Sequence, residues 1–254
     1  MVPKLQPVDP PALTSADATA AAGPYSTISG SDFSAEDIAL ALPLEAAEGS
    51  AIAAVEQIDT LPVTVGIVSR SGGTIVVAKG REGEPVLDMP GLSEGKDPPR
   101  AVVRVTARAS SEDALAPGEA SFSVGADFRK DRESSGTEVD NGDNFIQRGL
   151  ASDPGQFKIE VDRGRPACKI MGSEGSVEGK ADRKVSSGRW YRVRCSRSED
   201  TVTLDLIEFA PYGRVVDSSA QAKGRMGSVT WPQQETPPSS TAALRGGSLL
   251  PTAR

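Results

Sequence analysis

The chain of 254 residues contains no histidine. This absence excludes Ser-His-Asp and Cys-His nucleophile systems, which need an imidazole base, and every metal site with His ligands. Only two cysteines are present, so a four-ligand zinc site is not expected either. A pair of carboxylates remains possible as catalytic groups.

Long apolar runs and long basic runs are also missing. No window approaches the roughly 18 apolar residues of a membrane helix, so no membrane span is expected. The net charge of -7, without a long basic run, argues against nucleic acid as a partner, because phosphate binding needs Lys and Arg gathered on one face. At the start of the sequence as given, Lys4 is followed by Pro and Asp residues, which is not the apolar pattern of a signal peptide.

Aromatic residues make up only 4% of the chain, whereas hydrophobic residues make up 37%. The expected core is therefore lean and is built from Val, Leu, Ile and Ala. The 26 Gly and 19 Pro favour short strands joined by many turns. This composition predicts one all-β domain with a poorly ordered flank.

Alternation of apolar and polar residues is the main structural signal, because a half-buried strand has a period of two. It is clearest in Phe122–Phe128, where every second residue is apolar, and it recurs in Phe157–Asp162 and Thr201–Leu206. In Trp190–Cys195 it places Tyr191, Val193 and Cys195 on one face and Trp190, Arg192 and Arg194 on the other. These segments predict an antiparallel sheet.

Further strands are expected on the amino-terminal side. Val63–Val68 and Thr74–Ala78 are β-branched runs on either side of Ser71-Gly72-Gly73, which predicts a hairpin between them. Pro85–Pro90 has the pattern of a short edge strand, and Ala101–Ala107 that of a full strand.

Several of these segments together resemble a known family. The runs Gly155-Gln156-Phe157-Lys158-Ile159, Arg165-Pro166-Ala167-Cys168 and Gly188-Arg189-Trp190-Tyr191-Arg192-Val193-Arg194-Cys195 are similar, in order and spacing, to laminin-G-like, concanavalin-A-like jelly-roll domains, above all those of secreted bacterial proteins. The resemblance implies an antiparallel β-sandwich that covers residues 63–238. It also implies that the last strands of the sandwich are missing, so that the jelly roll is incomplete at its carboxyl end.

Two flanks complete the expected organisation. Residues 1–60 are Pro-, Ala- and Ser-rich, and we expect a largely disordered segment with short helices at Ser34–Asp37 and Leu44–Gln57. Residues 239–254 form a Ser/Thr/Gly/Pro tail without a strand pattern.

Cys168 and Cys195 fall at matching places on neighbouring strands of the predicted sheet. A disulfide between them would close a loop of about 28 residues and contribute roughly 3 kcal/mol by the chain-entropy estimate. Two free buried thiols are the alternative. A bridge would indicate an oxidising compartment, and therefore an extracellular or cell-surface location.

Asp140-Asn141-Gly142-Asp143-Asn144 gathers oxygen-bearing side chains around a glycine. Calcium prefers such ligands, and Asp140, Asp143 and Asn144 are the candidates to bind it. Asn-Gly is also a strong turn signal, so a tight turn without metal is the favoured interpretation of the same residues.

Trp190, Arg192 and Arg194 are the candidate ligand-binding residues, since an indole beside guanidinium groups suits stacking on a sugar and hydrogen bonding to it, above all to an acidic one. A solvated outer face is the alternative. The resemblance favours a non-catalytic module that recognises carbohydrate or an extracellular protein.

Glycosidases of concanavalin-like fold carry Glu-x-Asp-x-x-Glu, but here Glu160 and Asp162 are followed by Arg165. A glycoside hydrolase and an inactive remnant stay as alternatives.

Overall fold

We describe the protein from a computed structural model, which describes residues 40–41, 47–52, 58–59, 63–91, 97–107, 113, 115–132, 142–209 and 215–231. Two four-stranded antiparallel sheets form the centre of the molecule. The first has the order β11-β10-β9-β8, and its strands are β8 (Gly142–Arg148), β9 (Gln156–Asp162), β10 (Arg165–Gly172) and β11 (Gly175–Lys180). The second has the order β14-β13-β12-β7, and its strands are β7 (Phe122–Arg129), β12 (Trp190–Ser198), β13 (Thr201–Phe209) and β14 (Val215–Lys223).

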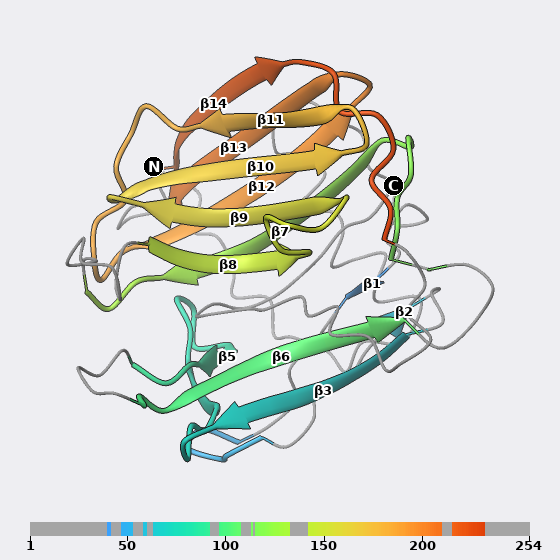
Figure 1. Ribbon diagram of the computed structural model, residues 1–254. Helices are drawn as coiled ribbons and strands as arrows, with labels where there is room; N and C mark the ends of the chain where they lie inside the picture. Colours follow the sequence, from blue (N-terminus) through green and yellow to red (C-terminus); the bar gives the residue numbers. More distant parts are fainter. Residues whose placement is uncertain are drawn as a thin grey trace.

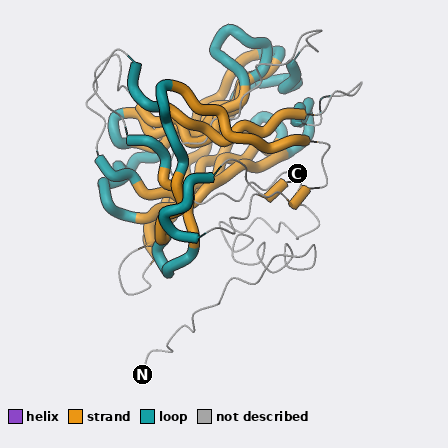
Figure 2. The backbone as a smooth tube through the Cα atoms, turned by 90° about the horizontal axis from the view of Figure 1, so that it is seen from below, coloured by secondary structure: helices purple, strands orange, loops and turns teal. Residues whose placement is uncertain are grey.

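The two sheets are stacked face to face, with β8–β11 in front of β7 and β12–β14 in Figure 1. Every second residue of β7 points into the space between them, as the alternation predicts. Phe122, Val124, Ala126 and Phe128 are all buried, and so are Tyr191, Val193 and Cys195 of β12. The predicted antiparallel β-sandwich is therefore confirmed. Figure 2 shows the strand layers from below, and the described part of the chain contains no helix.

Smaller β-ribbons of the amino-terminal half extend the same hydrophobic core. One joins β3 (Val63–Arg70) to β6 (Arg100–Ala107), and the other joins β4 (Val76–Lys79) to β5 (Pro85–Asp88). Val63, Val103 and Ile75 are fully buried in one cluster with the sandwich residues. The predicted hairpin between residues 63–68 and 74–78 is wrong, because β3 pairs with the distant β6 and leaves β4 to pair with β5.

The segment before Pro62 is described only in part. β1 (Leu40–Ala41) pairs with β2 (Ile58–Asp59), and Ala51 forms a bridge with Val76 of β4. Residues 47–52 form a turn and this bridge, so the helix expected over Leu44–Gln57 is wrong at these positions. The helix expected at Ser34–Asp37 and the tail 239–254 lie outside the described residues.

β8 begins at Gly142, so Asp143 and Asn144 belong to a strand and the predicted tight turn is wrong for these two residues. A β-bulge interrupts the pairing of β8 with β9 between Asn144 and Ile146. Because a bulge adds a residue on one strand, it changes the side chain alternation there. Phe145 and Ile146 are consequently both buried.

The predicted disulfide between Cys168 and Cys195 is present, with a Cα–Cα distance of 5.6 Å and both side chains fully buried. Its place differs from the expectation of neighbouring strands. Cys168 lies on β10 of the first sheet and Cys195 on β12 of the second, so the bridge crosses the core and fastens one sheet to the other.

The last described residues pack across one end of the sandwich. Val229 forms a single antiparallel bridge with Gly118. The indole of Trp231 packs edge-on against Phe157, with ring centroids 6.1 Å apart, and the guanidinium of Arg148 lies 3.9 Å from its centroid. The prediction that the last strands of the sandwich are missing concerns residues after 231, which lie outside the described residues.

Among the residues that the structure describes, no helix is long and apolar enough to cross a bilayer.

Candidate functional site

The outer face of the second sheet carries polar side chains in rows, because residues in register on neighbouring strands point the same way. β7, β12 and β13 supply one residue each to every row. The three rows nearest the start of β12 are Arg129, Trp190 and Phe209; Asp127, Arg192 and Ile207; and Gly125, Arg194 and Asp205. The face predicted from Trp190, Arg192 and Arg194 is therefore present as one column along β12.

The two arginines of this column are held by carboxylates. Arg192 donates two hydrogen bonds to Asp127, of 2.6 and 2.9 Å, and Arg194 donates to Asp205 at 3.1 and 3.3 Å. The side chain of Arg192 is 11% exposed and that of Arg194 only 7%. The Arg192–Asp127 pair is bidentate, whereas Arg194 donates both of these hydrogen bonds to Oδ2 of Asp205. Each pair neutralises a guanidinium charge inside the protein and fixes its geometry. The structure thus offers little free positive charge here for an acidic sugar.

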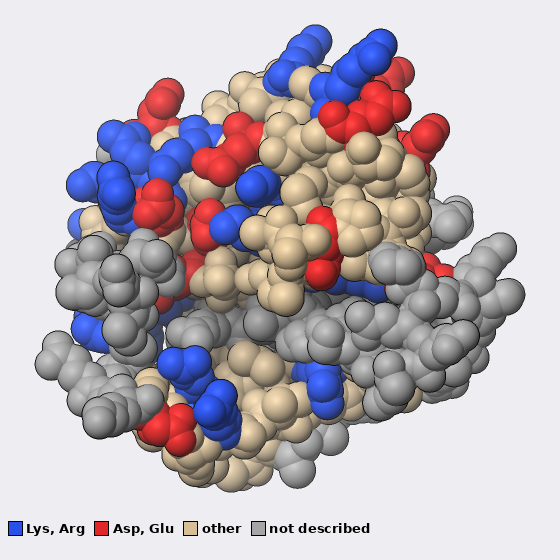
Figure 3. Space-filling view, in the orientation of Figure 1, with Lys and Arg blue, Asp and Glu red and all other residues tan. Residues whose placement is uncertain are grey.

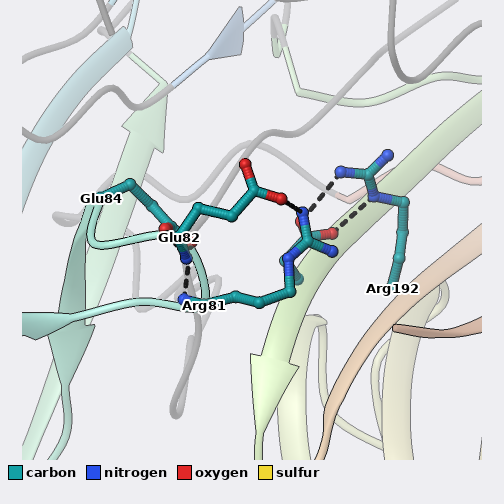
Figure 4. A network of polar contacts seen from close by, with 5 residues as sticks. Arg81, Glu82, Glu84 and Arg192 are labelled. Atoms are coloured by element: carbon teal, nitrogen blue, oxygen red, sulfur yellow. Dashed lines mark hydrogen bonds and ion pairs between the residues drawn. The ribbon is translucent and has the colours of Figure 1, made fainter. Parts of the chain in front are cut away.

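A turn of the β4–β5 hairpin lies over the same face. Glu84 shapes this turn by accepting the backbone N–H of Arg81 at 3.1 Å and that of Glu82 at 2.6 Å. The guanidinium of Arg81 then lies 3.7 Å from the ring centroid of Phe209, and that of Arg192 lies 5.2 Å from it. Figure 4 shows the turn residues facing Arg192 across the sheet surface. The hairpin therefore covers part of the outer face.

Trp190 lies beside this hairpin and lines a pocket of about 60 Å³. The pocket opens between β5, the end of β7 and the start of β12. Its lining consists of Ala78, Val86, Leu87, Asp88, Met89, Arg129, Asp131 and Trp190. The lining combines an apolar wall with an indole and three charged side chains, but its volume is well below the roughly 300–1,000 Å³ of sites that enclose a whole small ligand.

The charged groups of the pocket lie close together. Arg129 is 3.5 Å from Asp131, and its guanidinium lies 5.5 Å from the ring centroid of Trp190. Partial burial raises the pKa of Asp88, the negative charge of Asp131 raises this pKa further, and Arg129 opposes the shift. The side chains of Arg129 and Asp131 are 41% and 72% exposed, so both reach solvent at the rim.

Of the three predicted ligand-binding residues, only Trp190 lines this pocket. Asp88, Arg129 and Asp131 escaped the sequence reasoning, although two signals point to them. Asp88 ends a short apolar strand, and Arg129 and Asp131 stand directly after the most regular strand of the chain. Chain positions next to a strand end are common places for binding residues. What the sequence does not show is that β5 and β7 bring these ends together.

The predicted calcium ligands have different surroundings. The carboxylate of Asp143 lies 3.0 Å from Nζ of Lys130, a nearly buried ammonium whose side chain is 5% exposed. A protein cation thus already neutralises Asp143. Asn144 follows it in β8, so the two side chains leave the strand on opposite faces. Asp140 is outside the described residues, and the described residues contain no group of three or more acidic or Cys side chains arranged to hold a metal.

Glu160 and Asp162 lie on the outer face of the first sheet. Nζ of Lys158 lies 2.7 Å from Glu160, and Nζ of Lys180 lies 2.9 Å from Asp162. The Lys180 hydrogen bond holds the pKa of Asp162 below its usual range. Figure 3 shows Lys and Arg side chains interspersed with Asp and Glu over the visible surface. These two carboxylates are compensated surface charges rather than a pair that faces a cavity.

Comparison with known proteins concerns the fold. Neither a scan against family models nor a search of curated proteins finds a match. Among solved structures, the LG1-3 region of the laminin alpha2 chain is similar at 16% identity and a TM-score of 0.36, over 59% of this chain and 24% of that chain. Laminin G domains thus appear among the solved structures that are similar to this chain.

Two other similar structures come from different proteins. The binding domain of Paraclostridial Mosquitocidal Protein 1 matches at 12% identity and a TM-score of 0.45, over 77% of this chain and 45% of that one. The enzymatically active domain of tailspike protein 2 from bacteriophage CBA120 matches at 15% identity and a TM-score of 0.42, over 75% and 28%. The chain spans less than half of each compared protein. Likeness at this level describes the architecture and transfers no ligand or activity.

Proposed function

We propose that this β-sandwich module binds carbohydrate without catalysing its cleavage, and that the pocket beside Trp190 is its binding site. The observation that carries the proposal is the combination of one indole with Asp88, Asp131 and Arg129 around a single pocket. The C–H face of a sugar packs on an aromatic ring, while its hydroxyl groups form charge-assisted hydrogen bonds with carboxylates and guanidinium groups.

The surroundings of the carboxylates support a non-catalytic role. A glycosidase needs two carboxyl groups that flank the scissile bond, one of them kept protonated by a largely dry environment. Asp131 is 72% exposed, and Glu160 and Asp162 are paired with lysines on the opposite sheet. Neither set provides a sheltered acid beside a nucleophile.

An extracellular or cell-surface location forms part of the proposal. The buried bridge between Cys168 and Cys195 supports it, because disulfides persist in oxidising compartments. The sheltered position of both sulfurs would also protect the bridge from exchange with other thiols.

A glycan array followed by titration calorimetry tests the proposal. Trp190→Ala should weaken binding of any glycan found by at least about tenfold, which corresponds to about 1.4 kcal/mol of stacking. Leu150→Ala is the matched control, since it removes another exposed apolar side chain and Leu150 does not line the pocket. The thermal midpoint of each variant shows whether it has folded.

Two results would contradict this proposal. Unchanged glycan affinity in a folded Trp190→Ala protein would move the site away from the pocket. Release of reducing ends from a bound polysaccharide, lost on substitution of Asp88 or Asp131, would show that the module is an enzyme.

A further inference from the structure

The pocket beside Trp190 has an excess of negative charge. Among its lining residues, Asp88 and Asp131 are acidic and Arg129 alone is basic, while the other five carry no charge. With both carboxylates ionised, the lining therefore has a net charge of about -1. A ligand that enters it meets a negative potential, strengthened by the apolar wall that excludes water.

The positive charge of Arg129 is already engaged. Its guanidinium lies 3.5 Å from Asp131 and leans over the ring of Trp190. Asp88 is in a different situation, since its carboxylate has no hydrogen bond or ion pair with any residue that the structure describes. Asp88 is thus the pocket carboxylate without a direct partner among the described residues, and Arg129 compensates it only at longer range. It is exposed at the end of β5 and has a second carboxylate nearby, so an added cation favours its ionised form.

The size of the pocket limits what that cation can be. A water molecule needs roughly 10–15 Å³ of such space, so about 60 Å³ holds about four waters. This is enough for one ammonium group and the carbon that bears it, and too little for an entire sugar ring. The remainder of a ligand would lie outside, over the exposed parts of Arg129 and Asp131.

We propose that the pocket recognises the protonated amine of an amino sugar, with Asp88 as the residue that determines the preference for amine over acetamide or hydroxyl. The inference rests on the proposed carbohydrate-binding function and narrows it to one class of glycan. A sugar ammonium donates three hydrogen bonds, which suit Asp88 and Asp131, and its positive charge is attracted to the ring of Trp190. An acetamide carries no charge, so it gains nothing from the negative charge of the two carboxylates.

The experiment compares two ligands that differ only in this group. Calorimetry at near-neutral pH measures the affinity of a glucosamine trisaccharide with free amines and of its fully N-acetylated counterpart. The wild-type protein should bind the free amine form about tenfold or more tightly. Asp88→Asn should remove most of this preference, because the side chain keeps its shape and loses its charge.

Two controls accompany the measurement. Glu178→Gln removes an exposed carboxylate from β11 of the other sheet and should leave the preference intact. Added salt should lower affinity for the free amine form more than for the acetylated one, since screening acts on the charged pair.

The outcomes separate this inference from the function on which it rests. Equal affinity for the two trisaccharides, or a preference that survives Asp88→Asn, would overturn the amine specificity and leave carbohydrate binding standing. If neither trisaccharide binds and an array detects no other glycan, both proposals fail. Tighter binding of the acetylated form would also overturn the inference.

Discussion

Arg194 and Asp205 are almost completely buried, and they neutralise each other across neighbouring strands. Glu208 is likewise buried and is contacted by Arg183 and Arg189. Charges removed from water need such partners, because an isolated buried charge is very costly. Asp88 differs from these groups because it is exposed at the end of β5, where water solvates its charge. The fold therefore does not require a partner for it.

A pH-dependent gain of stability should follow from replacing Asp88 by Asn. The pKa of Asp88 is raised in the folded protein, so the folded state holds its proton more tightly than the unfolded state. The group then contributes stability below its unfolded pKa of about 4, and this contribution is lost as the pH rises through the folded value. At neutral pH the ionised Asp88 costs stability, so Asp88→Asn should raise the thermal midpoint there and lose its advantage in acid.

Asp162→Asn is the control of opposite sign. Lys180 lowers the pKa of Asp162, so this carboxylate stabilises the protein at neutral pH and ceases to do so as the pH falls through its folded value. Its replacement should lower the neutral midpoint slightly, since exposed pairs contribute little. A lower neutral midpoint for Asp88→Asn would show that the pocket carboxylate supports the fold.

Among the elements, β7 approaches β12 unusually closely at one residue. Gly125 faces Arg194 across the two strands, on the side that holds the Arg194–Asp205 pair. A Cβ at position 125 would lie 2.7 Å from the carbonyl oxygen of Val193 and 3.4 Å from Cα of Arg194. Both are backbone atoms of a central strand, which cannot move aside without disturbing the ladder on either side.

Gly125→Ala should therefore destabilise the sandwich by about 1–3 kcal/mol, the usual cost of overpacking. Urea denaturation measures this loss. Gly66→Ala is the matched control, because Gly66 also lies within a strand, β3, and a Cβ there would meet nothing within 4 Å. If the two variants have the same midpoint, the close approach of β7 to β12 does not constrain the sequence.

Elements with strict alternation were predictable, and this pattern places β7, β9, β12 and β13 correctly. β11 and β14 were missed because Gly175-Ser176-Val177-Glu178-Gly179-Lys180 and residues 215–223 are edge strands with few apolar residues. An alternating pattern arises when one face of a strand is buried, and these two strands bury few apolar side chains. The pairing of β3 with β6 was missed because local turn signals at Gly72 and Gly73 do not reveal a distant partner.

Only the part of the candidate site that comes from a single strand, β12, could be predicted from the sequence. Trp190 was found because its strand is regular, but its surroundings come from β5 and the end of β7, far away in the sequence. Sequence alternation also suggested that Arg192 and Arg194 are available, because it gives the face of a side chain and not its partners. Their partners, Asp127 and Asp205, can be identified only when the pairing register of β12 with β7 and β13 is known.

At the scale of the whole molecule, the disulfide joins the two halves of the core. Cys168→Ala with Cys195→Ala should lower the free energy of unfolding by about 3 kcal/mol, mainly because the unfolded chain regains the freedom of a loop 27 positions long. Chemical denaturation with and without reductant measures the difference. Reductant should weaken the wild type and leave the double variant unchanged. Equal stability of the two proteins without reductant would show that the bridge is not needed to hold the sheets together.

The same bridge alters how the chain carries mechanical load. When a protein is stretched from its two ends, tension follows the shortest covalent path, which here runs through the sulfur atoms of Cys168 and Cys195 and bypasses the residues between them. Fully extended, those residues would span about 90 Å at about 3.4 Å each. This part of the chain cannot be extended until the bridge is reduced. Trp190 lies inside this shielded loop, so the backbone around its indole stays free of tension when the chain is pulled from its two ends.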